Sequence, residues 1–270
     1  MIGLPSSLLP DLRVRADDAV EIMDGPCDPD MLTRTYADFR VVNAVVSGWG
    51  TVYRNEIRPA LSTTRLTTLL DIGSGGGDVS RALARWAARD GLRLSVLGID
   101  PDARAHEFCL GLPAQPGLTF RRAFSSELVA EGQTFDFVVS NHMLHHLGPA
   151  ELGALLVDSE HLCRHRVLHA DIERSRFAYL GFALGTWPFF RRSYIRPDGL
   201  TSIRRSFTVG ELRAAAPPGW QVTRGLPSRL VLEWRAPAGI ARTRPAAHSA
   251  TTRPASASPS HPGEEGGSHA

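Results

Sequence analysis

A glycine-rich stretch, LLDIGSGGGDVS at residues 69–80, has the composition of a ligand-binding loop. It follows an apolar run typical of a β-strand and precedes RALARWAAR, which is typical of a helix. Glycine permits positive φ and lets a ligand approach the backbone where a Cβ would collide. Asp71 stands directly before the glycines. A bare loop with a carboxylate at its entrance suits a ligand that carries positive charge.

Two ligand classes suit such a loop, a dinucleotide and S-adenosylmethionine (SAM). The dinucleotide fingerprint GxGxxG is incomplete in both frames, because Asp78 or Ser80 stands where the third glycine should be. Asp78 would also place negative charge where a pyrophosphate binds, at the first turn of the helix. SAM has no phosphate, and Asp71 can attract its ammonium directly or through water. The loop therefore favours SAM, with an NAD-dependent oxidoreductase as the alternative.

Two more polar residues end strand-like segments. LSVLGID ends in Asp100, where a carboxylate can accept hydrogen bonds from both ribose hydroxyls of a nucleotide. A helix N-cap is the structural alternative for Asp100. FDFVVSN ends in Asn141 and runs directly into a group of histidines. Asn141 and these histidines are therefore expected to lie near the bound ligand.

The histidines after FDFVVSN are candidates for acid–base chemistry. His142, His145 and His146 form an HxxHH pattern, and His169 lies near the end of a later apolar segment. Histidine suits a general base because its ordinary pKa is near neutral. We favour His145 or His146 as the catalytic base, with a structural role as the alternative. No further ligands stand at a known metal-site spacing, so we predict no metal.

These residues must be positioned by the strands and helices between residues 66 and 172. The apolar segments TTLLDI, LSVLGID, LTFRRAF, FDFVVSN and RVLHADI alternate with helical patterns. This alternation predicts an α/β fold, a parallel sheet with helices on both faces. The candidate residues follow the strands, and ligands bind at the carboxyl ends of such strands.

Flanking segments complete the predicted organisation. Residues 1–64 form an N-terminal helical cap, in which apolar spacing predicts a helix over residues 30–54 with a break at 48–50. Residues 65–235 form the core, with a helical lid at about 174–208. The tail, residues 236–270, has one large aliphatic residue and no aromatic one, so we predict that it is disordered.

The lid contains the longest apolar run of the chain, residues 177–190, which is too short to span a bilayer. It is either a buried helix or a cover over an apolar substrate. Six aromatic side chains would offer surface to a planar guest: Phe177, Tyr179, Phe182, Trp187, Phe189 and Phe190. Arg204 and Arg205 could reach an acidic or phenolate substrate, or form a surface charge pair.

Composition limits the function classes. The 270 residues carry a formal net charge of +2. This near-neutral balance does not indicate binding to nucleic acid or to an anionic membrane, because such proteins are usually strongly basic. The three scattered cysteines indicate a reducing compartment. The first residues lack the pattern of a secretory signal. We therefore expect a cytoplasmic protein with a small-molecule partner, no nucleic acid and no membrane insertion.

Taken together, DIGSGGGD, GIDPD and FDFVVSNHMLHHL resemble the class I SAM-dependent methyltransferases over about residues 66–172. The resemblance implies a Rossmann-like, seven-stranded, mostly parallel sheet flanked by helices, in which QVTRG and RLVLEWRA form a reversed hairpin. It also implies which residues hold SAM. Asp71, Gly73 and Gly75 would line its methionine part, Asp100 would bind the ribose, and Phe124 would lie beside the adenine. Asn141 would lie under the methionyl backbone, and Tyr36 and Arg40 would close over the carboxylate.

The flanks TRTYADFRVVNAVVSGW, ADIERSRFAYLGFAL and RPDGLTSIRRSFTVGEL resemble bacterial methyltransferases of the quinone and polyketide type. This narrower resemblance implies O- or C-methylation of a small aromatic or polyketide-like metabolite of secondary metabolism, by a monomer or homodimer. Two alternatives remain: the NAD-dependent oxidoreductase, and a catalytically inactive SAM-fold binding protein.

Overall fold

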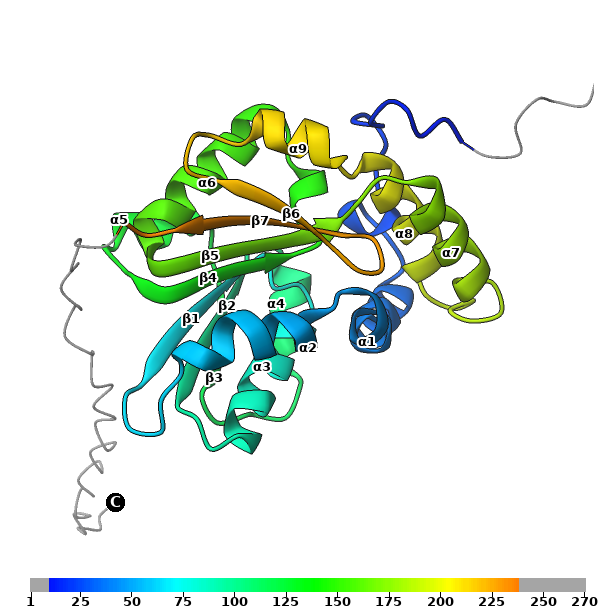
Figure 1. The fold of residues 1–270 in the computed structure, drawn as a ribbon. Helices are drawn as coiled ribbons and strands as arrows, with labels where there is room; N and C mark the ends of the chain where they lie inside the picture. The colour runs from blue at the N-terminus through cyan, green and yellow to red at the C-terminus, as the bar shows by residue number, and fades with distance from the viewer. Residues whose placement is uncertain (1–9, 238–270) are drawn as a thin grey trace, which may run out of the picture.

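The computed structural model describes residues 10–237, which form a seven-stranded sheet flanked by helices (Figure 1). The strands lie in the order β3-β2-β1-β4-β5-β7-β6, and β7 runs antiparallel to the other six strands. Their bounds are β1 (Thr67–Ile72), β2 (Leu94–Asp100), β3 (Leu118–Arg122), β4 (Phe135–Asn141), β5 (Cys163–Ile172), β6 (Gln221–Gly225) and β7 (Arg229–Arg235). This sheet confirms the predicted α/β fold and its terminal hairpin.

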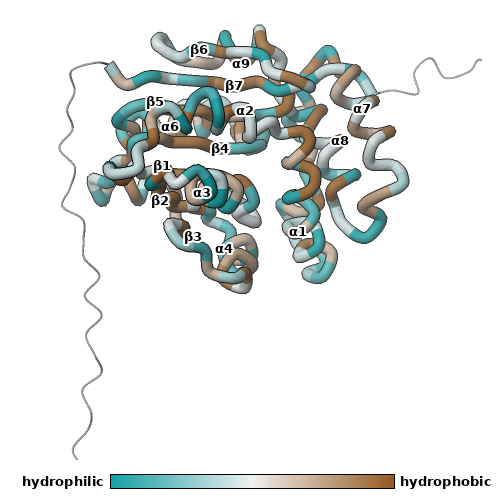
Figure 2. Tube along the Cα trace, turned by 60° about the horizontal axis from the view of Figure 1, so that its bottom comes forward, coloured by the Kyte–Doolittle hydropathy of each residue, from teal (hydrophilic) through white to brown (hydrophobic). Residues whose placement is uncertain are grey.

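The connecting helices cover both faces of the sheet. They are α3 (Asp78–Arg89), α4 (Ala103–Leu110), α5 (Ser125–Ala130), α6 (Pro149–Leu162) and α9 (Val209–Ala215). Val138 and Val139 are neighbours in β4 and point to opposite faces. Val138 packs in a cluster that includes Leu156 of α6, and Val139 packs in one that includes Leu83 of α3. Burial on both faces explains why β4 is largely apolar, as its brown colour in Figure 2 shows.

The strand order reverses between β1 and β4. The chain runs from β1 outward to β2 and β3, and then returns to β4 on the other side of β1. A crevice for ligands forms at such a switch point, outside the carboxyl ends of the strands. Three helices lie together at this end of the sheet (Figures 1 and 2): α1 (Pro29–Val46), α7 (Arg176–Thr186) and α8 (Ile195–Arg205).

The N-terminal helix is interrupted where the sequence predicts a break. The Asp28 carboxylate accepts a hydrogen bond from the Met31 N–H at 2.9 Å and so caps α1. Gly48 then has a φ of +64°, in the left-handed region that glycine favours. Helical structure resumes in α2 (Trp49–Val52), the π-helical turn η2 (Tyr53–Ile57) and the 3-10 turn η3 (Arg58–Ala60). A short 3-10 turn, η1 (Ile22–Asp24), precedes α1.

The orientation of the lid aromatics corrects the expectation that all six offer surface to a planar guest. Phe177, Trp187 and Phe189 are 70%, 73% and 62% exposed, so they offer no enclosed surface to a guest. Phe182 instead turns inward, with its ring so close to Gly199 of α8 that an added Cβ there would collide. Residues three or four apart share one face of a helix, and the face of α7 that carries Phe177 points to solvent. The run at 177–190 is therefore not a buried helix.

Two expectations concern the ends of the chain and the membrane. The tail predicted to be disordered, residues 236–270, lies outside the described residues from residue 238 onward. Within residues 10–237, no helix has the length and apolarity needed to cross a bilayer.

We expect the Phe137→Ala substitution to lower the free energy of unfolding by about 3–5 kcal/mol, because it leaves a cavity in the core. Phe137 lies in central strand β4 and is 0% exposed. Urea unfolding would measure the change. The matched control is Phe177→Ala on the outer face of α7, for which we expect a change of less than about 0.5 kcal/mol. Equal losses in the two variants would contradict the assignment of core and surface.

Candidate functional site

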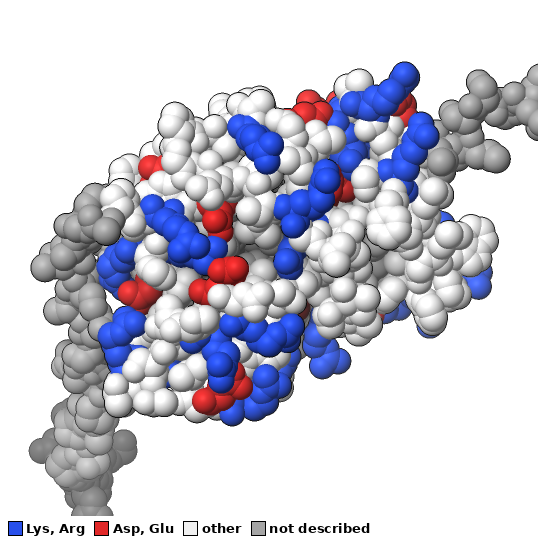
Figure 3. All heavy atoms as spheres, in the orientation of Figure 1, with Lys and Arg blue, Asp and Glu red and all other residues white. Residues whose placement is uncertain are grey.

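A cavity of about 700 Å³ lies at the carboxyl ends of the parallel strands. The loops after β1 and β4 line it on the sheet side, and residues of α1 and α8 line it opposite. Its volume falls within the range of small-molecule sites, about 300–1,000 Å³. On the face of the molecule in Figure 3, basic side chains predominate, with smaller groups of acidic side chains between them.

The glycine-rich loop between β1 and α3 leaves room for a ligand. Gly73 and Gly75 have positive φ values of 66° and 51°. A Cβ on Gly73 would collide with the side chain of Met143, so this position requires glycine. A Cβ on Gly75 would meet no atom within 4 Å. The space in front of Gly75 is therefore open to the cavity, as expected for a loop that a ligand approaches closely.

Asp71 lines the cavity and is only 1% exposed. Its Oδ2 accepts a hydrogen bond from Ser80 Oγ at 2.6 Å, whereas its buried Oδ1 has no hydrogen-bond partner among the described residues. Burial raises the pKa of Asp71 to about 7, the Ser80 hydrogen bond opposes this rise, and the charges of Asp78 and Asp100 add to it. An unpaired carboxylate oxygen beside a cavity fits a ligand that carries N–H donors.

Asp100 ties β2 to the glycine-rich loop. Its Oδ2 accepts from the Gly75 N–H at 2.8 Å, and its Oδ1 accepts from the Asp102 N–H at 2.9 Å. Burial raises the pKa of Asp100, and these two bonds partly offset the rise. The N-cap of α4 is Asp102, so the alternative role of Asp100 as that cap is wrong. Each Asp100 oxygen retains a lone pair for a ligand in the cavity.

Three further predicted cofactor residues line the same cavity: Tyr36, Phe124 and Asn141. The ring of Tyr36 packs against Phe108, with 5.2 Å between ring centroids. Asn141 Oδ1 accepts a hydrogen bond from Trp49 Nε1 at 2.8 Å, which orients its amide. Phe124 is largely exposed, so it lies at the rim. The structure thus brings these three residues together with the glycine-rich loop.

Arg40 is the exception among the predicted cofactor residues. It lies on α1, and its side chain is exposed and does not line the cavity. Tyr36 and Arg40 are four residues apart, and yet only Tyr36 turns toward the glycine-rich loop. The structure therefore does not place Arg40 where it could close over a cofactor carboxylate.

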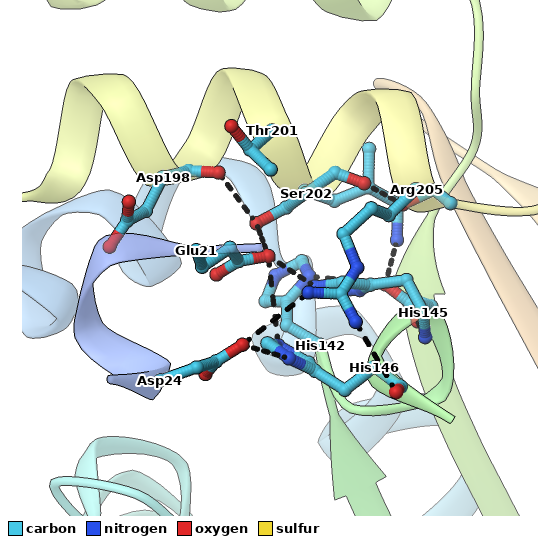
Figure 4. Close-up of polar contacts among 12 residues, drawn as sticks. Glu21, Asp24, His142, His145, His146, Asp198, Thr201, Ser202 and Arg205 are labelled. Atoms are coloured by element: carbon cyan, nitrogen blue, oxygen red, sulfur yellow. Dashed lines mark hydrogen bonds and ion pairs between the residues drawn. The ribbon is translucent and has the colours of Figure 1, made fainter. Parts of the chain in front are cut away.

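At the other end of the cavity, two of the histidines join three carboxylates. We call this group the histidine–carboxylate cluster; it consists of Glu21, Asp24, His145, His146 and Asp171. Figure 4 shows the first four of these residues. His145 Nδ1 lies 2.8 Å from Asp171 Oδ1, and His146 Nδ1 lies 3.1 Å from Asp24 Oδ2. The two imidazole rings lie 4.3 Å apart between centroids. Both predicted base candidates therefore line the cavity and are held by carboxylates.

The carboxylates change the charge state of His145. Burial lowers the pKa of His145, but Asp171 and Glu21 outweigh burial and raise it to about 9. Burial raises the pKa of Asp171, but His145 and His142 outweigh it and hold that pKa well below its usual range. At neutral pH, His145 is therefore an imidazolium between two carboxylates. In that state it can stabilise negative charge on a ligand but cannot accept a proton.

The other two histidines have different surroundings. His142 lines the cavity with a φ of +53°, and its Nδ1 lies 3.7 Å from Asp171 Oδ1. His169 is fully buried outside the cavity, between Ser140 Oγ at 2.8 Å and Ser159 Oγ at 3.0 Å. Burial lowers the pKa of His169 to about 3, so it remains neutral. We therefore assign His169 a packing role, which corrects its candidacy as a base.

Sequence reasoning missed all three carboxylates of the cluster. Asp171 is the penultimate residue of β5, and its position after an apolar segment could have indicated it. Glu21 directly precedes the short 3-10 turn η1 and Asp24 ends it, and no motif or spacing marks either residue. Arg205 also lines the cavity, with Nη1 3.4 Å from Asp24 Oδ2, whereas its neighbour Arg204 does not line it.

Comparison with known proteins identifies the domain. A model of the methyltransferase domain family matches residues 69–178. The ubiquinone biosynthesis O-methyltransferase of Methylobacterium sp. (strain 4-46) is 37% identical over 86 residues, which cover 30% of each chain. The protein of the same name from Rhizobium etli (strain CIAT 652) is 34% identical over 89 residues, 31% of this chain and 32% of the relative. The match thus spans about a third of these relatives' length.

Solved structures share the fold at low sequence identity. The plantazolicin methyltransferase BpumL, in complex with a triazolic desmethylPZN analog and SAH, superposes with a TM-score of 0.54 at 11% identity, over 76% of this chain and 89% of that chain. Human N-acetylserotonin methyltransferase in complex with SAM superposes with a TM-score of 0.54 at 11% identity, over 77% of this chain and 56% of that chain.

The family match and the seven-stranded fold agree with the prediction from the motifs. Residues 69–178 are therefore similar to the methyltransferase domain family, in agreement with the resemblance of the motifs to the class I SAM-dependent methyltransferases.

Proposed function

We propose that this protein transfers a methyl group from SAM to an oxygen or carbon atom of a small aromatic or polyketide-like metabolite. One observation carries the proposal: a single cavity connects the glycine-rich loop and Asp100 with the histidine–carboxylate cluster. Cofactor and acceptor would share this space, and holding both in line supplies much of the rate enhancement of a group transfer. The relatives are ubiquinone biosynthesis O-methyltransferases, and this favours oxygen as the acceptor atom.

The cofactor half of the cavity fits SAM by its hydrogen-bonding groups. SAM, when bound, supplies a methyl group on a positively charged sulfur. The unpaired Oδ1 of Asp71 would accept a hydrogen bond from the ammonium, directly or through water. Asp100 would accept from the ribose hydroxyls, and the open space at Gly75 would admit the methionine chain.

The charge of this half favours SAM over a dinucleotide. Asp71, Asp78 and Asp100 all line it, and repulsion from the other two contributes to the raised pKa of Asp71. A pyrophosphate would add negative charge beside these carboxylates, whereas a cation would reduce their repulsion. Asp78 also occupies the first turn of α3, where a phosphate would otherwise bind. These charges argue against the NAD-dependent oxidoreductase.

The acceptor half combines apolar walls with the charged cluster. Its apolar lining includes Phe39, Val42 and Val46 of α1, Leu155 of α6, Phe182 of α7 and Ile195 of α8. Such walls suit a planar, apolar guest and exclude water from it. An aromatic acceptor would therefore lie between α1 and the lid, with its reacting oxygen toward the cluster.

The cluster would stabilise the negative charge that develops on the acceptor and would accept its proton. His145, as an imidazolium held by Asp171 and Glu21, would stabilise negative charge that develops on the acceptor oxygen. The transfer breaks the sulfur–methyl bond, forms the oxygen–methyl bond and releases the hydroxyl proton. His146 is the more exposed of the two candidates and would receive that proton as general base.

We expect the protein to bind SAM and S-adenosylhomocysteine but not NAD, as calorimetric titration would show. Asp100→Ala should weaken SAM binding about 10- to 100-fold, because hydrogen bonds to a charged group contribute about 1.5–3 kcal/mol. The matched control is Arg40→Ala, which we expect to leave the affinity unchanged because Arg40 is exposed away from the cavity. Binding of NAD alone would overturn the proposal.

Turnover then separates an enzyme from an inactive binding protein. The purified chain would be incubated with methyl-labelled SAM and a panel of phenols, hydroxyquinols and polyketide-like phenolics. We expect label in an extractable product. SAM binding without label transfer to any acceptor would favour the inactive alternative.

We also expect the affinity for SAM to fall up to about tenfold between pH 8 and pH 6, because the pKa of Asp71 is about 7 in the free protein. Above that pKa the carboxylate is ionised and attracts a cation; below it, the neutral acid does not. Calorimetry across this range would measure the change. Asp78 and Asp100 also have raised pKa values, so Asp71→Asn is the necessary control. An unchanged pH dependence in Asp71→Asn would contradict the assignment.

A further inference from the structure

Three potential ligand atoms converge at the lid end of the cavity. His145 Nε2 lies 3.3 Å from Glu21 Oε1, and His146 Nε2 lies 3.8 Å from the same oxygen. All three ligand atoms lie within 4.8 Å of one another. Glu21 comes from the segment before α1, and both histidines come from the loop after β4 (Figure 4). Two imidazoles and a carboxylate are a ligand set typical of zinc and related divalent ions.

A carboxylate contacts Nδ1 of each imidazole, on the side of the ring away from Glu21. Asp171 Oδ1 lies 2.8 Å from Nδ1 of His145, and Asp24 Oδ2 lies 3.1 Å from Nδ1 of His146. A bound ion would displace the Nε2 proton that His145 carries at neutral pH. With the remaining proton on each Nδ1, the lone pair of each Nε2 would be directed toward Glu21. Metal-binding histidines almost always have such a carboxylate or carbonyl partner on the other ring nitrogen. The cluster therefore has the outer-shell support of a metal site.

One nitrogen of the cluster lacks a hydrogen-bond partner. His145 is 1% exposed, and its Nε2 makes no hydrogen bond among the described residues, although Glu21 Oε1 is 3.3 Å away. In a tetrahedral site with metal–ligand bonds of about 2.0–2.1 Å, neighbouring ligand atoms are about 3.3–3.4 Å apart. The separation of Nε2 and Oε1 matches that spacing, and a small movement of His146 would bring its nitrogen to the same distance.

The local charge also favours a cation. Three carboxylates, those of Glu21, Asp24 and Asp171, lie against the two imidazoles, and Arg205 pairs with only one of them, Asp24. Other charged groups nearby have partners of their own. Arg15 lies 3.0 Å from Asp17, and Asp198 accepts hydrogen bonds from the N–H groups of Ile22 and Met23. With both imidazoles neutral, the cluster keeps a net negative charge that a divalent cation would neutralise.

We propose that Glu21, His145 and His146 bind a divalent transition-metal ion, with Zn²⁺ the best match to this ligand set. Ser202 Oγ donates to Glu21 Oε1 at 2.8 Å and keeps that oxygen in place while leaving it a lone pair. All three ligands line the cavity, so the fourth coordination position faces the acceptor half. An acceptor hydroxyl or carbonyl oxygen could occupy that position, where the ion would lower the pKa of a hydroxyl. Metal binding can be tested apart from methyl transfer, but with an ion bound, the ion would replace His145 as the group that stabilises negative charge, and His146 would be a ligand and not a general base.

Metal titration of the full chain tests this proposal without any activity assay. After treatment with a chelator, the protein would be titrated with Zn²⁺ by calorimetry and with Co²⁺ by visible absorption, which reports four-coordinate geometry. We expect one ion per chain and a rise in thermal stability with metal concentration. Glu21→Gln and His146→Ala should each weaken binding at least about tenfold. Asp24→Asn, which replaces the carboxylate beside His146 with a neutral amide, should weaken binding about 10-fold or more.

The control addresses the other histidines of the chain. A variant with His248, His261 and His269 of the tail all changed to Ala should bind the ion as tightly as the original chain. Metal-free unfolding curves of Glu21→Gln and His146→Ala would show that both variants fold. SAM titration of the same variants keeps this result separate from the test of methyl transfer. Absence of a bound ion, retention of full affinity in both ligand variants, or loss only in the tail variant would overturn the proposal.

Discussion

The contact between Asp171 and His145 fixes the acceptor end of the cavity. Asp171 accepts the backbone N–H of His145 at 2.9 Å through Oδ2, and it contacts Nδ1 of the same residue at 2.8 Å through Oδ1. Backbone and ring are therefore held at once, which locks the loop after β4 to the end of β5. Removing one member of such a buried pair costs about 3–5 kcal/mol, because the other charge is left alone. Glu21 Oε1 lies 3.3 Å from Nε2 on the other side of the same ring, so the segment before α1 also contributes to the site.

The two ends of the cavity have opposite electrostatic requirements. At the glycine-rich loop, the pKa of Asp71 is raised by burial and by its acidic neighbours, so positive charge is favoured there. At the cluster, the carboxylates favour positive charge on or between the imidazoles, which in turn attracts an anionic oxygen. A sulfonium at one end and a hydroxyl that loses its proton at the other satisfy both requirements. A dinucleotide would not, because its pyrophosphate would lie beside Asp71, Asp78 and Asp100.

The parts of the fold and site that the sequence predicts correctly are those encoded locally. Apolar runs that end in Asp71, Asp100 and Asn141 predict the strands, because parallel strands buried on both faces need such runs. The glycine spacing predicts an open loop, and Gly75 has that open space. Parallel strands end at the same edge of the sheet, so their last residues meet in the cavity regardless of how far apart they lie in the sequence. Helical spacing does not show that Tyr36 lines the cavity and Arg40 does not, because a helix places residues four apart near each other without fixing which one faces a ligand.

What the sequence could not predict depends on how separate segments dock. Helical spacing groups Phe177 with Trp187 but does not say whether their shared face meets the cavity or solvent. The prediction of no metal rested on ligand spacing along the sequence, and the metal site that we propose would not be visible in that spacing. Glu21 supplies the third group of that site from a segment that reaches the histidines only in the folded chain. A ligand set assembled across the fold leaves no spacing signature, so only the geometry could show it.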